Sequence, residues 1–320
     1  MTPKISIVIC TYNRANLLGE CLKSIMKQTS KSDGYEVVVI DDRSTDQTPI
    51  VVKSFQHEFS SNLFQYIVDD RKGLSASRNL GYQYAHGKYV AYLDDDVRIP
   101  KNWLSNAMYI ISKYRNSLIA LGGPEKPFFA GGKKPDWFKA KYAVMSKKIL
   151  GSQERYLKKG ESLTGSNMII KKNTLMEIGG FDERLGMKGK NLYLHEETDL
   201  FYRLFEYTNN TAKIFYSPKL SVFHEVSDKK QTLSYILQRS YAGGCAWFDM
   251  QNRRKAHLSQ IMSVFLAAGY VFIHIVYSGV TFVTYPRWQN WVAERLSKIV
   301  FGLGYIANGL HFRIRIKQIR

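Results

Sequence analysis

The stretch YVAYLDDD at residues 89–96 ends in three consecutive aspartates, Asp94, Asp95 and Asp96. An apolar run of this length is typical of a buried strand, so the three carboxylates stand together where that strand surfaces. Neighbouring carboxylates repel one another, and a divalent cation carrying a phosphate ligand relieves the repulsion. The stretch therefore indicates a site for a metal and a diphosphate. The alternative is a solvated turn in which an aspartate caps a helix near Pro100.

Three earlier apolar runs also end in polar or acidic residues, and helical periodicity separates them. The runs are Ile5–Cys10, Tyr35–Ile40 and Phe64–Val68, and they lead into Thr11, Asp41 and Asp69. Because apolar and polar residues do not alternate within these runs, both faces of each strand should be buried. We therefore predict an α/β fold with a mostly parallel sheet and helices on both faces. Ligands of such sheets gather at the carboxyl ends of the strands.

Two of these strand ends carry groups suited to a nucleotide. A carboxylate at Asp41 or Asp42 can accept the N3–H of a uracil or thymine ring, and Tyr12 offers the base an apolar face. The same turn can instead cap the helix that begins near Pro49. Residues 71–79, RKGLSASRN, combine cations with glycine and small residues at a helix start, which suits a diphosphate.

The basic charge of the chain is large and unevenly distributed. Lys and Arg outnumber Asp and Glu by 46 to 27, a net charge of +19. This balance predicts attraction to nucleic acid, anionic lipid or a phosphorylated substrate. Eleven basic residues against three acidic ones lie within 133–172, and seven against one within 287–320. We expect the first cluster to meet acceptor phosphate and the second to meet anionic lipid, because unshielded carboxylates at four strand ends would repel a nucleic acid.

The C-terminal quarter has a different character. Residues 256–286 contain no Asp, Glu, Lys or Arg, and their core, Ile261–Tyr285, is long enough to cross a bilayer interior of about 30 Å. Basic residues flank both ends, at Arg253–Lys255 and Arg287, so a hairpin or an in-plane insertion that returns to the cytoplasm fits better than a single crossing. A buried helix pair of a soluble domain is the alternative. The shorter apolar stretch Ile299–Phe312 suits a helix at the membrane interface.

Six short motifs stand in order along the chain. They are SIVICTYNR at 6–14, IDDRSTD at 40–46, GLSASRN at 73–79, LDDD at 93–96, GGFDE at 179–183 and EETDL at 196–200. Together they resemble a bacterial, inverting glycosyltransferase of family 2 over about residues 4–226. The resemblance implies the GT-A fold, a Rossmann-like α/β fold. It also implies a catalytic domain at residues 1–228, divided near residue 122 into a nucleotide-sugar half and an acceptor half, followed by a helical, membrane-associated region at 229–320.

The resemblance assigns a role to each motif. Contacts to the nucleoside diphosphate sugar fall on Thr11, Tyr12, Arg14, Asp41, Asp42, Arg78, Asn79, Asp94 and Asp95. Asp96 of the DxD element would contact a Mg²⁺ or Mn²⁺ ion that bridges the two phosphates. His224 would complete the shell of the metal or the phosphate, and an ordinary strand-end histidine is the alternative for this residue.

The acidic motif of the family usually runs Glu-Asp-x-Asp, and its second position is the general base. That position is Glu197 in this chain, one methylene longer than aspartate. The base is therefore Glu197 oriented by Glu196, or the reverse. One carboxylate must take the proton of the acceptor hydroxyl as it attacks the anomeric carbon. An in-line attack inverts that carbon.

These features predict a metal-dependent hexosyltransferase in the synthesis of envelope or capsule polysaccharide. Its donor would be a nucleoside diphosphate sugar, with UDP favoured, and its acceptor a glycan or a lipid-linked saccharide. The enzyme would act at the cytoplasmic face of the inner or plasma membrane, with an anionic membrane surface and no nucleic acid as partner.

Two alternatives remain open at this point. A sugar-nucleotide nucleotidyltransferase would bring an early Gly-rich loop, where this chain has TYNR at 11–14. A non-enzymatic protein that binds membranes or nucleic acid would explain the net charge of +19 but not the acidic strand ends.

Overall fold

The computed structural model describes nine segments of the chain. They are residues 3–29, 34–58, 63–71, 73–114, 117–132, 134–143, 151–189, 191–252 and 257–311. Lys72, Lys133, Arg253–Lys255 and Phe312 lie outside them. Contacts divide the chain into two compact units. The first is Met1–Phe128, Val144–Glu183 and Glu196–Glu225, and the second is Phe129–Ala143, Arg184–His195 and Val226–Arg320.

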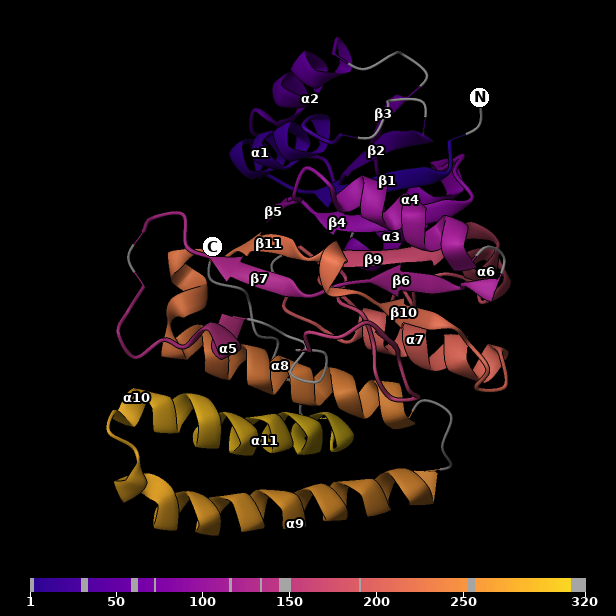
Figure 1. Cartoon of the computed structure of the whole chain (residues 1–320). Helices are drawn as coiled ribbons and strands as arrows, with labels where there is room; N and C mark the ends of the chain where they lie inside the picture. The colour runs from indigo at the N-terminus through magenta and orange to yellow at the C-terminus, as the bar shows by residue number, and fades with distance from the viewer. Residues whose placement is uncertain are drawn as a thin grey trace. The chain divides into compact units, whose positions relative to one another are not determined.

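The first unit is built on a sheet of eight strands (Figure 1). The strands are β1 (Ile5–Thr11), β2 (Tyr35–Asp41), β3 (Phe64–Val68), β4 (Tyr89–Asp94), β6 (Ala120–Gly122), β8 (Arg155–Tyr156), β9 (Asn167–Lys171) and β10 (Ile214–Tyr216). Their order is β3-β2-β1-β4-β9-β6-β10-β8. Strand β9 runs antiparallel to both β4 and β6, and β8 runs antiparallel to β10, whereas the other pairs are parallel. The predicted mostly parallel sheet is confirmed.

Helices cover both faces of this sheet, as predicted. Helices α1 (Ala15–Met26), α2 (Thr48–Gln56) and α4 (Trp103–Tyr114) supply one core cluster, whereas α6 (Lys172–Glu177) and α7 (Glu196–Tyr207) supply the other. Helix α3 (Leu74–Tyr84) packs so closely on β1 that a side chain at Gly81 would clash with Val8. Along β1, Ile7 and Ile9 enter the first core and Val8 enters the second. Burial on both faces is the reason that the strand runs are continuously apolar.

A second, three-stranded sheet completes the first unit. Its strands are β5 (Val97–Arg98), β7 (Glu125–Phe128) and β11 (Val222–Glu225), in the order β5-β11-β7. Strand β11 pairs antiparallel with β5, which directly follows the aspartate triplet. The Glu225 N–H donates a hydrogen bond to the Asp96 carbonyl over 2.9 Å. Through this pairing, β11 lies beside the residues that follow β4.

The second unit consists mainly of helices. They are α5 (Ala140–Ala143), α8 (Leu233–Asn252), α9 (His257–Thr281), α10 (Trp288–Trp291) and α11 (Ser297–Gly309). A 3₁₀ turn, Phe282–Thr284, follows α9, and a π-helical turn, Val292–Leu296, precedes α11. Helix α11 lies between α8 and α9 (Figure 1). Gly244 and Gly304 allow α8 and α11 to approach, because a side chain at either position would clash with the backbone of the other helix. The apolar residues from Ile299 to Gly309 thus pack between α8 and α9, and their predicted place at a membrane interface stays a prediction.

One apolar stretch of the second unit remains uncovered. Among the described residues, the helical stretch Leu258–Thr284 is long and apolar enough to cross a membrane, judged by length and composition. Only 11% of its most apolar window is buried. The alternative of a fully buried helix pair therefore does not hold, although α9 and α11 do form a pair.

Candidate active site

The carboxyl ends of the first four strands meet at one edge of the large sheet. The Asp42 N–H donates to the Thr11 carbonyl over 3.0 Å, and the Asp69 N–H donates to the Asp41 carbonyl over 2.8 Å. The Thr11 hydroxyl in turn donates to Asp95 Oδ2 over 2.9 Å. This chain of contacts joins β1, β2, β3 and β4, so the acidic residues predicted to cluster do lie together.

Arg14 neutralises part of the aspartate triplet. Its Nη1 lies 2.7 Å from Asp95 Oδ1 and 3.3 Å from Asp96 Oδ2. Burial raises the pKa of Asp95, and the guanidinium opposes this rise. The charge of Asp95 conversely raises the pKa of Arg14. The aspartate triplet predicts a divalent ion that relieves the repulsion, but Arg14 supplies part of this relief.

Three side chains around the triplet form a group that can hold a metal ion. One ligand atom each from Asp94, Asp96 and His224 lies within 4.8 Å of the others. His224 Nε2 is 3.1 Å from Asp96 Oδ1, and β11 carries it there. The side chain of Asp94 is 34% exposed and that of Asp96 only 6%, so the group opens on the Asp94 side. Two carboxylates with an imidazole fit Mn²⁺ better than Mg²⁺, which prefers oxygen ligands alone.

Arg78 links this metal-ligating group to helix α7. The buried guanidinium donates from Nη2 to Asp94 Oδ1 over 3.2 Å and from Nη1 to Glu196 Oε1 over 2.9 Å. The backbone of Gly165 lies against this guanidinium, so any side chain at position 165 would clash with it. The sequence did not indicate this role for Gly165. The only local signal is its place in Thr-Gly-Ser, two residues before β9.

Two glutamates of contrasting environment begin α7. Glu196 is buried, and burial together with the neighbouring Glu197 charge raises its pKa to about 8, although Arg78 opposes the shift. Glu197 is half-buried and accepts the Gly165 N–H over 3.3 Å. The residue before them, His195, has a φ of 74°, an unusual conformation for a residue other than glycine. The backbone therefore turns sharply into the pair, and the second glutamate is the more open one.

The two aspartates that end β2 differ in the same way. Asp41 is buried and accepts hydrogen bonds from the Ser44 N–H, the Ser44 hydroxyl and the Tyr66 hydroxyl, over 2.8, 2.6 and 2.5 Å. Asp42 is half-buried and lies 3.4 Å from the Arg43 guanidinium. Burial raises the pKa of Asp42. The Asp42 side chain is therefore the more accessible of the two at this edge of the sheet.

Helix capping in this turn falls on a third aspartate. Asp46 accepts the Thr48 N–H at the start of α2 and the Ala15 N–H at the start of α1, each over 3.0 Å. The capping alternative considered for Asp41 and Asp42 thus belongs to Asp46, which ties two helix starts to one side chain.

Asn79 holds the loop that follows α6. Its Nδ2 donates to the Phe181 carbonyl over 2.9 Å, and its Oδ1 accepts the Phe181 N–H over 2.8 Å. Gly180, with a φ of 64°, lies so close that a side chain there would clash with the Asn79 amide. The Asn79 side chain therefore fastens the Gly-Gly-Phe motif, a contact that the sequence did not predict. Tyr12 lies half-buried at the end of β1.

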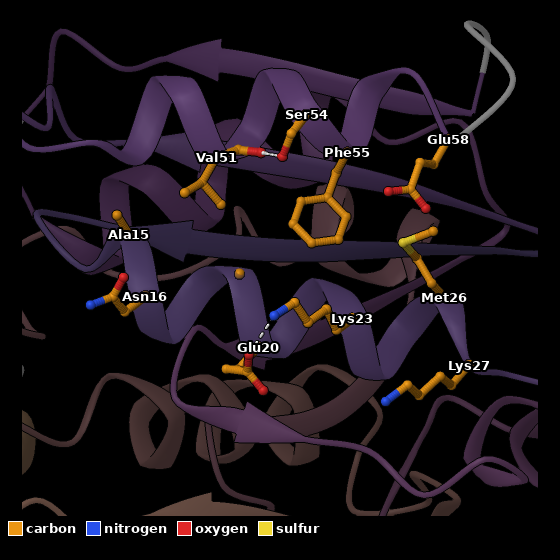
Figure 2. A pocket seen from close by; sticks show the side chains of 11 residues that line it. Ala15, Asn16, Glu20, Lys23, Met26, Lys27, Val51, Ser54, Phe55 and Glu58 are labelled. Carbon is orange, nitrogen blue, oxygen red and sulfur yellow. Dashed lines mark hydrogen bonds and ion pairs between the residues drawn. The ribbon is translucent and has the colours of Figure 1, made fainter.

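A separate open groove between α1 and α2 has a volume of about 790 Å³. Figure 2 shows the side chains that line it. Phe55 and Met26 line it, together with the ion pair between Lys23 and Glu20. None of the acidic strand-end residues lines this groove. The candidate site is therefore the carboxyl edge of the sheet and not the groove.

Comparison with known proteins identifies the family. The model of the family described as glycosyl transferase family 2 matches residues 6–177, more than half of the chain. The chain belongs to glycosyltransferase family 2. Membership sets aside the two alternatives of a nucleotidyltransferase and a non-enzymatic binding protein, and it agrees with the GT-A fold described above.

Relatives of this family 2 protein occur in archaea and bacteria. A glucosyl-dolichyl phosphate glucuronosyltransferase of Haloferax volcanii is 24% identical over 82% of this chain and 84% of its own length. A GalNAc(5)-diNAcBac-PP-undecaprenol β-1,3-glucosyltransferase of Campylobacter jejuni is 28% identical over 63% of this chain and 65% of its own length. The chain spans less than two thirds of the length of several curated relatives, for example 14% of a minor teichoic acid biosynthesis protein of Bacillus subtilis.

Solved structures show the same fold at low sequence identity. A mannosyltransferase of Pyrobaculum calidifontis, in complex with GDP-Man and Mn²⁺, superposes with a TM-score of 0.63 at 17% identity, over 95% of this chain and 87% of that one. Residues 1–349 of S. aureus TarS, in complex with UDP-GlcNAc, give a TM-score of 0.54 at 17% identity, over 95% and 91% of the two chains. The family 2 protein thus shares its fold with nucleotide-sugar complexes.

Proposed function

We propose that this family 2 member is an inverting, metal-dependent hexosyltransferase. It moves a sugar from a nucleoside diphosphate sugar, with UDP favoured, to a hydroxyl of a glycan or lipid-linked saccharide in envelope or capsule polysaccharide synthesis. Residues 1–228 form the catalytic domain, and residues 229–320 associate with the cytoplasmic face of the membrane. One observation carries the proposal: the metal-ligating group of Asp94, Asp96 and His224 is joined through Arg78 to a pair of glutamates.

The donor side of the site is assigned from the strand ends. Asp42 accepts from the base, because its side chain is the more open of the aspartate pair, and Tyr12 lies against the base. Arg14, whose side chain is 36% exposed, holds Asp95 and faces the diphosphate. Asp94, Asp96 and His224 hold Mn²⁺, or less favourably Mg²⁺. When bound, this ion neutralises charge on the leaving diphosphate.

The acceptor side is assigned from the two glutamates. Glu197 takes the proton of the acceptor hydroxyl, because it is the more open of the pair and occupies the base position of the family motif. Glu196 is held by Arg78 and positions Glu197. Because Arg78 also contacts Asp94, it fixes the glutamate pair relative to the metal-ligating group. The hydroxyl oxygen forms a bond to the anomeric carbon while the bond from that carbon to the diphosphate breaks on the opposite side. The product therefore has inverted configuration.

The names of two relatives support a lipid-linked acceptor. One is a glucosyl-dolichyl phosphate glucuronosyltransferase, and the other acts on a saccharide carried by PP-undecaprenol. Such acceptors lie in a membrane, and the uncovered apolar stretch at Leu258–Thr284 suits an enzyme that works at its surface.

A donor screen tests the proposal. Purified full-length protein is incubated with Mn²⁺ and UDP-, GDP- and dTDP-sugars, and release of the nucleoside diphosphate is measured. We expect turnover of one donor class and a loss of at least about 100-fold in kcat for Asp96→Asn, since charge on the leaving group is then poorly neutralised. Glu58→Gln, at an exposed acid after α2 and away from the carboxyl edge of the sheet, is the control. No turnover of any donor would reject the proposal.

The choice of base has its own test. Glu197→Gln should abolish transfer to acceptor while leaving donor affinity within about twofold, because a general base acts on the acceptor hydroxyl alone. Glu196→Gln should retain measurable transfer. The reverse ranking of the two variants would assign the base to Glu196.

A further inference from the structure

The polar residues of helix α9 lie mainly on its covered side, although Ser259 is exposed, and large apolar residues dominate its exposed side. Gln260, Ser263, His274 and Ser278 are half-buried or buried against the rest of the second unit. The most exposed apolar residues, each between 60% and 87% accessible, are Leu258, Met262, Phe265, Leu266, Phe272, Ile273 and Val280 on α9 and Val283 in the turn that follows it. A helix of a water-soluble domain has the opposite arrangement. The exposed side of α9 therefore suits an apolar medium.

The distribution of these residues selects lipid over a second protein. Residues 256–286 contain no charged residue, and exposed apolar side chains surround most of the helix. A helix from a second copy would cover one seam about two positions wide per heptad and would leave the other apolar residues in water. Acyl chains cover the whole exposed surface at once.

The C-terminal end of α9 carries the side chains typical of a membrane interface. The Arg295 guanidinium lies 4.4 Å from the centre of the Tyr277 ring, and Trp291 Nε1 donates to the Ser278 carbonyl over 2.9 Å. Trp288, on α10, is more than half exposed. Tryptophan, tyrosine and arginine gather at the level of lipid headgroups, and the cation is complementary to anionic phosphates.

Basic residues from another segment join this end. The ammonium groups of Lys139 and Lys141 lie 3.2 and 2.6 Å from Glu294 Oε1, within the π-helical turn. Arg287 lies 3.8 Å from Asp136. Cations outnumber acids here, so the rim formed by Trp288, Arg287, Arg295, Lys139 and Lys141 is complementary to an anionic surface.

The neighbours of α9 decide how it lies in the lipid. Helix α11 and the turns before it run back along α9: Gly309 lies against Val264, Gly302 against Val271, and Trp291 against Ser278. The 25 residues of α9 are about 38 Å long, so it is lined by these segments over most of its length.

Spanning would be costly for these neighbours. Arg295 and Lys298 lie on the returning segment, and α8, on the far side of α11, carries Arg239 and Asp249. A perpendicular α9 would draw these charges into the bilayer interior, where charged side chains are strongly disfavoured. If α9 lies flat, α11 and α8 remain on the water side.

We propose that α9 lies in the plane of an anionic phospholipid bilayer, with its exposed apolar face among the acyl chains and its basic, aromatic rim at the headgroups. The inference builds on the membrane association in the proposed function and is independent of sugar transfer. It makes the second unit a monotopic anchor.

Vesicle flotation of the full chain tests the anchor. The double variant Phe265→Asp/Phe272→Asp should reduce the bound fraction on phosphatidylcholine vesicles with 30% phosphatidylglycerol by at least tenfold. Ile50→Asp on α2 is the matched control, because Ile50 and Phe265 are both 69% exposed. Equal binding of the double variant and the control would overturn the proposal. Donor turnover without vesicles, measured on the same samples, reports on the active site alone and should be unchanged by the double variant.

Depth measurement distinguishes lying from spanning. Leu258→Cys, Ile273→Cys and Val283→Cys each receive a fluorophore, and nitroxide lipids with labels at several depths quench it. The wild-type chain, with its three cysteines, gives the labelling background. Equal depths support the in-plane arrangement. A deep label at 273 between shallow labels at 258 and 283 would overturn it in favour of a spanning helix. If no label is quenched and light scattering detects dimers, a second copy of the chain covers α9 and the proposal is overturned.

Discussion

Arg78 joins two carboxylates that lie far apart along the chain. It is fully buried, and Asp94 and Glu196 each accept from one of its terminal nitrogens. Removing the guanidinium would leave the buried carboxyl of Glu196 without its hydrogen-bond donor, which costs about 1–3 kcal/mol. An exposed ion pair of similar length contributes about 0–1 kcal/mol, because water screens it.

We therefore expect Arg78→Met to lower the free energy of unfolding by about 1–3 kcal/mol. Lys23→Met is the control, because the pair between Lys23 and Glu20 is 2.7 Å long and more than half exposed. This variant should stay within about 0.5 kcal/mol of the wild type. Urea unfolding followed by circular dichroism measures both. A similar loss of stability in the two variants would show that the buried pair contributes no more than the exposed one.

Glu36 is a buried acid near the amino end of β2, away from the carboxyl edge that carries the candidate site. It accepts from the Ser6 hydroxyl over 2.5 Å, and its Oε2 lies 2.9 Å from His86 Nδ1. Burial would raise its pKa, but the hydrogen bonds from Ser6 and His86 outweigh burial, so the pKa of Glu36 is lowered. An acid with a lowered folded-state pKa binds fewer protons in the folded protein than in the unfolded one. Its contribution to stability is present above the ordinary value of 4.5 and is lost as the pH falls through the lower folded value.

Glu36→Gln should therefore cost about 1–3 kcal/mol at pH 7, with the difference from wild type shrinking as the pH falls below about 4.5. Thermal unfolding between pH 3 and 8 measures the effect. Glu58→Gln, at an exposed position after α2, should follow the wild type throughout. A constant difference across the pH range would contradict the explanation.

At the scale of elements, Asp46 couples the starts of two helices. Its carboxylate caps α2 within its own turn, through Thr48, and α1 across the sheet edge, through Ala15. A single cap is worth about 0.5–2 kcal/mol, so Asp46→Ala should cost about 1–3 kcal/mol. Asp46→Asn keeps the acceptor oxygens in part and should recover at least half of the loss. Urea unfolding measures both, and a loss below 0.5 kcal/mol for the alanine variant would contradict the double cap.

The second unit is held together by contacts between distant segments. Glu294 accepts from Lys141 and Tyr142 over 2.6 and 2.7 Å, some 150 positions away. Burial acts to raise its pKa, but these hydrogen bonds and that of Lys139 lower the pKa of Glu294 to about 2. The carboxylate is thus the anchor of residues 134–143.

Glu294→Gln should accelerate amide hydrogen exchange in residues 134–143 by about fivefold to tenfold, because a local opening then costs about 1–1.4 kcal/mol less. Exchange in β1 and β4, in the other unit, should be unchanged. Mass spectrometry of peptides from the exchanged protein measures this. Acceleration throughout the chain would indicate global destabilisation instead.

The sequence by itself determined the α/β architecture, the family and the acidic edge of the sheet. Those features depend on local signals: strands buried on both faces are continuously apolar, and ligand-facing residues follow their carboxyl ends. Only the tertiary structure decided which arginine neutralises which carboxylate, that His224 reaches Asp96 through β11, and that α11 packs against α9. These contacts join residues from 16 positions apart, for Arg78 and Asp94, to 128 positions apart, for Asp96 and His224, and no periodicity or composition records such pairings. The same reason applies to α9. Its composition indicates an apolar helix, but only its contacts with α11 and Trp291 show which of its sides is covered.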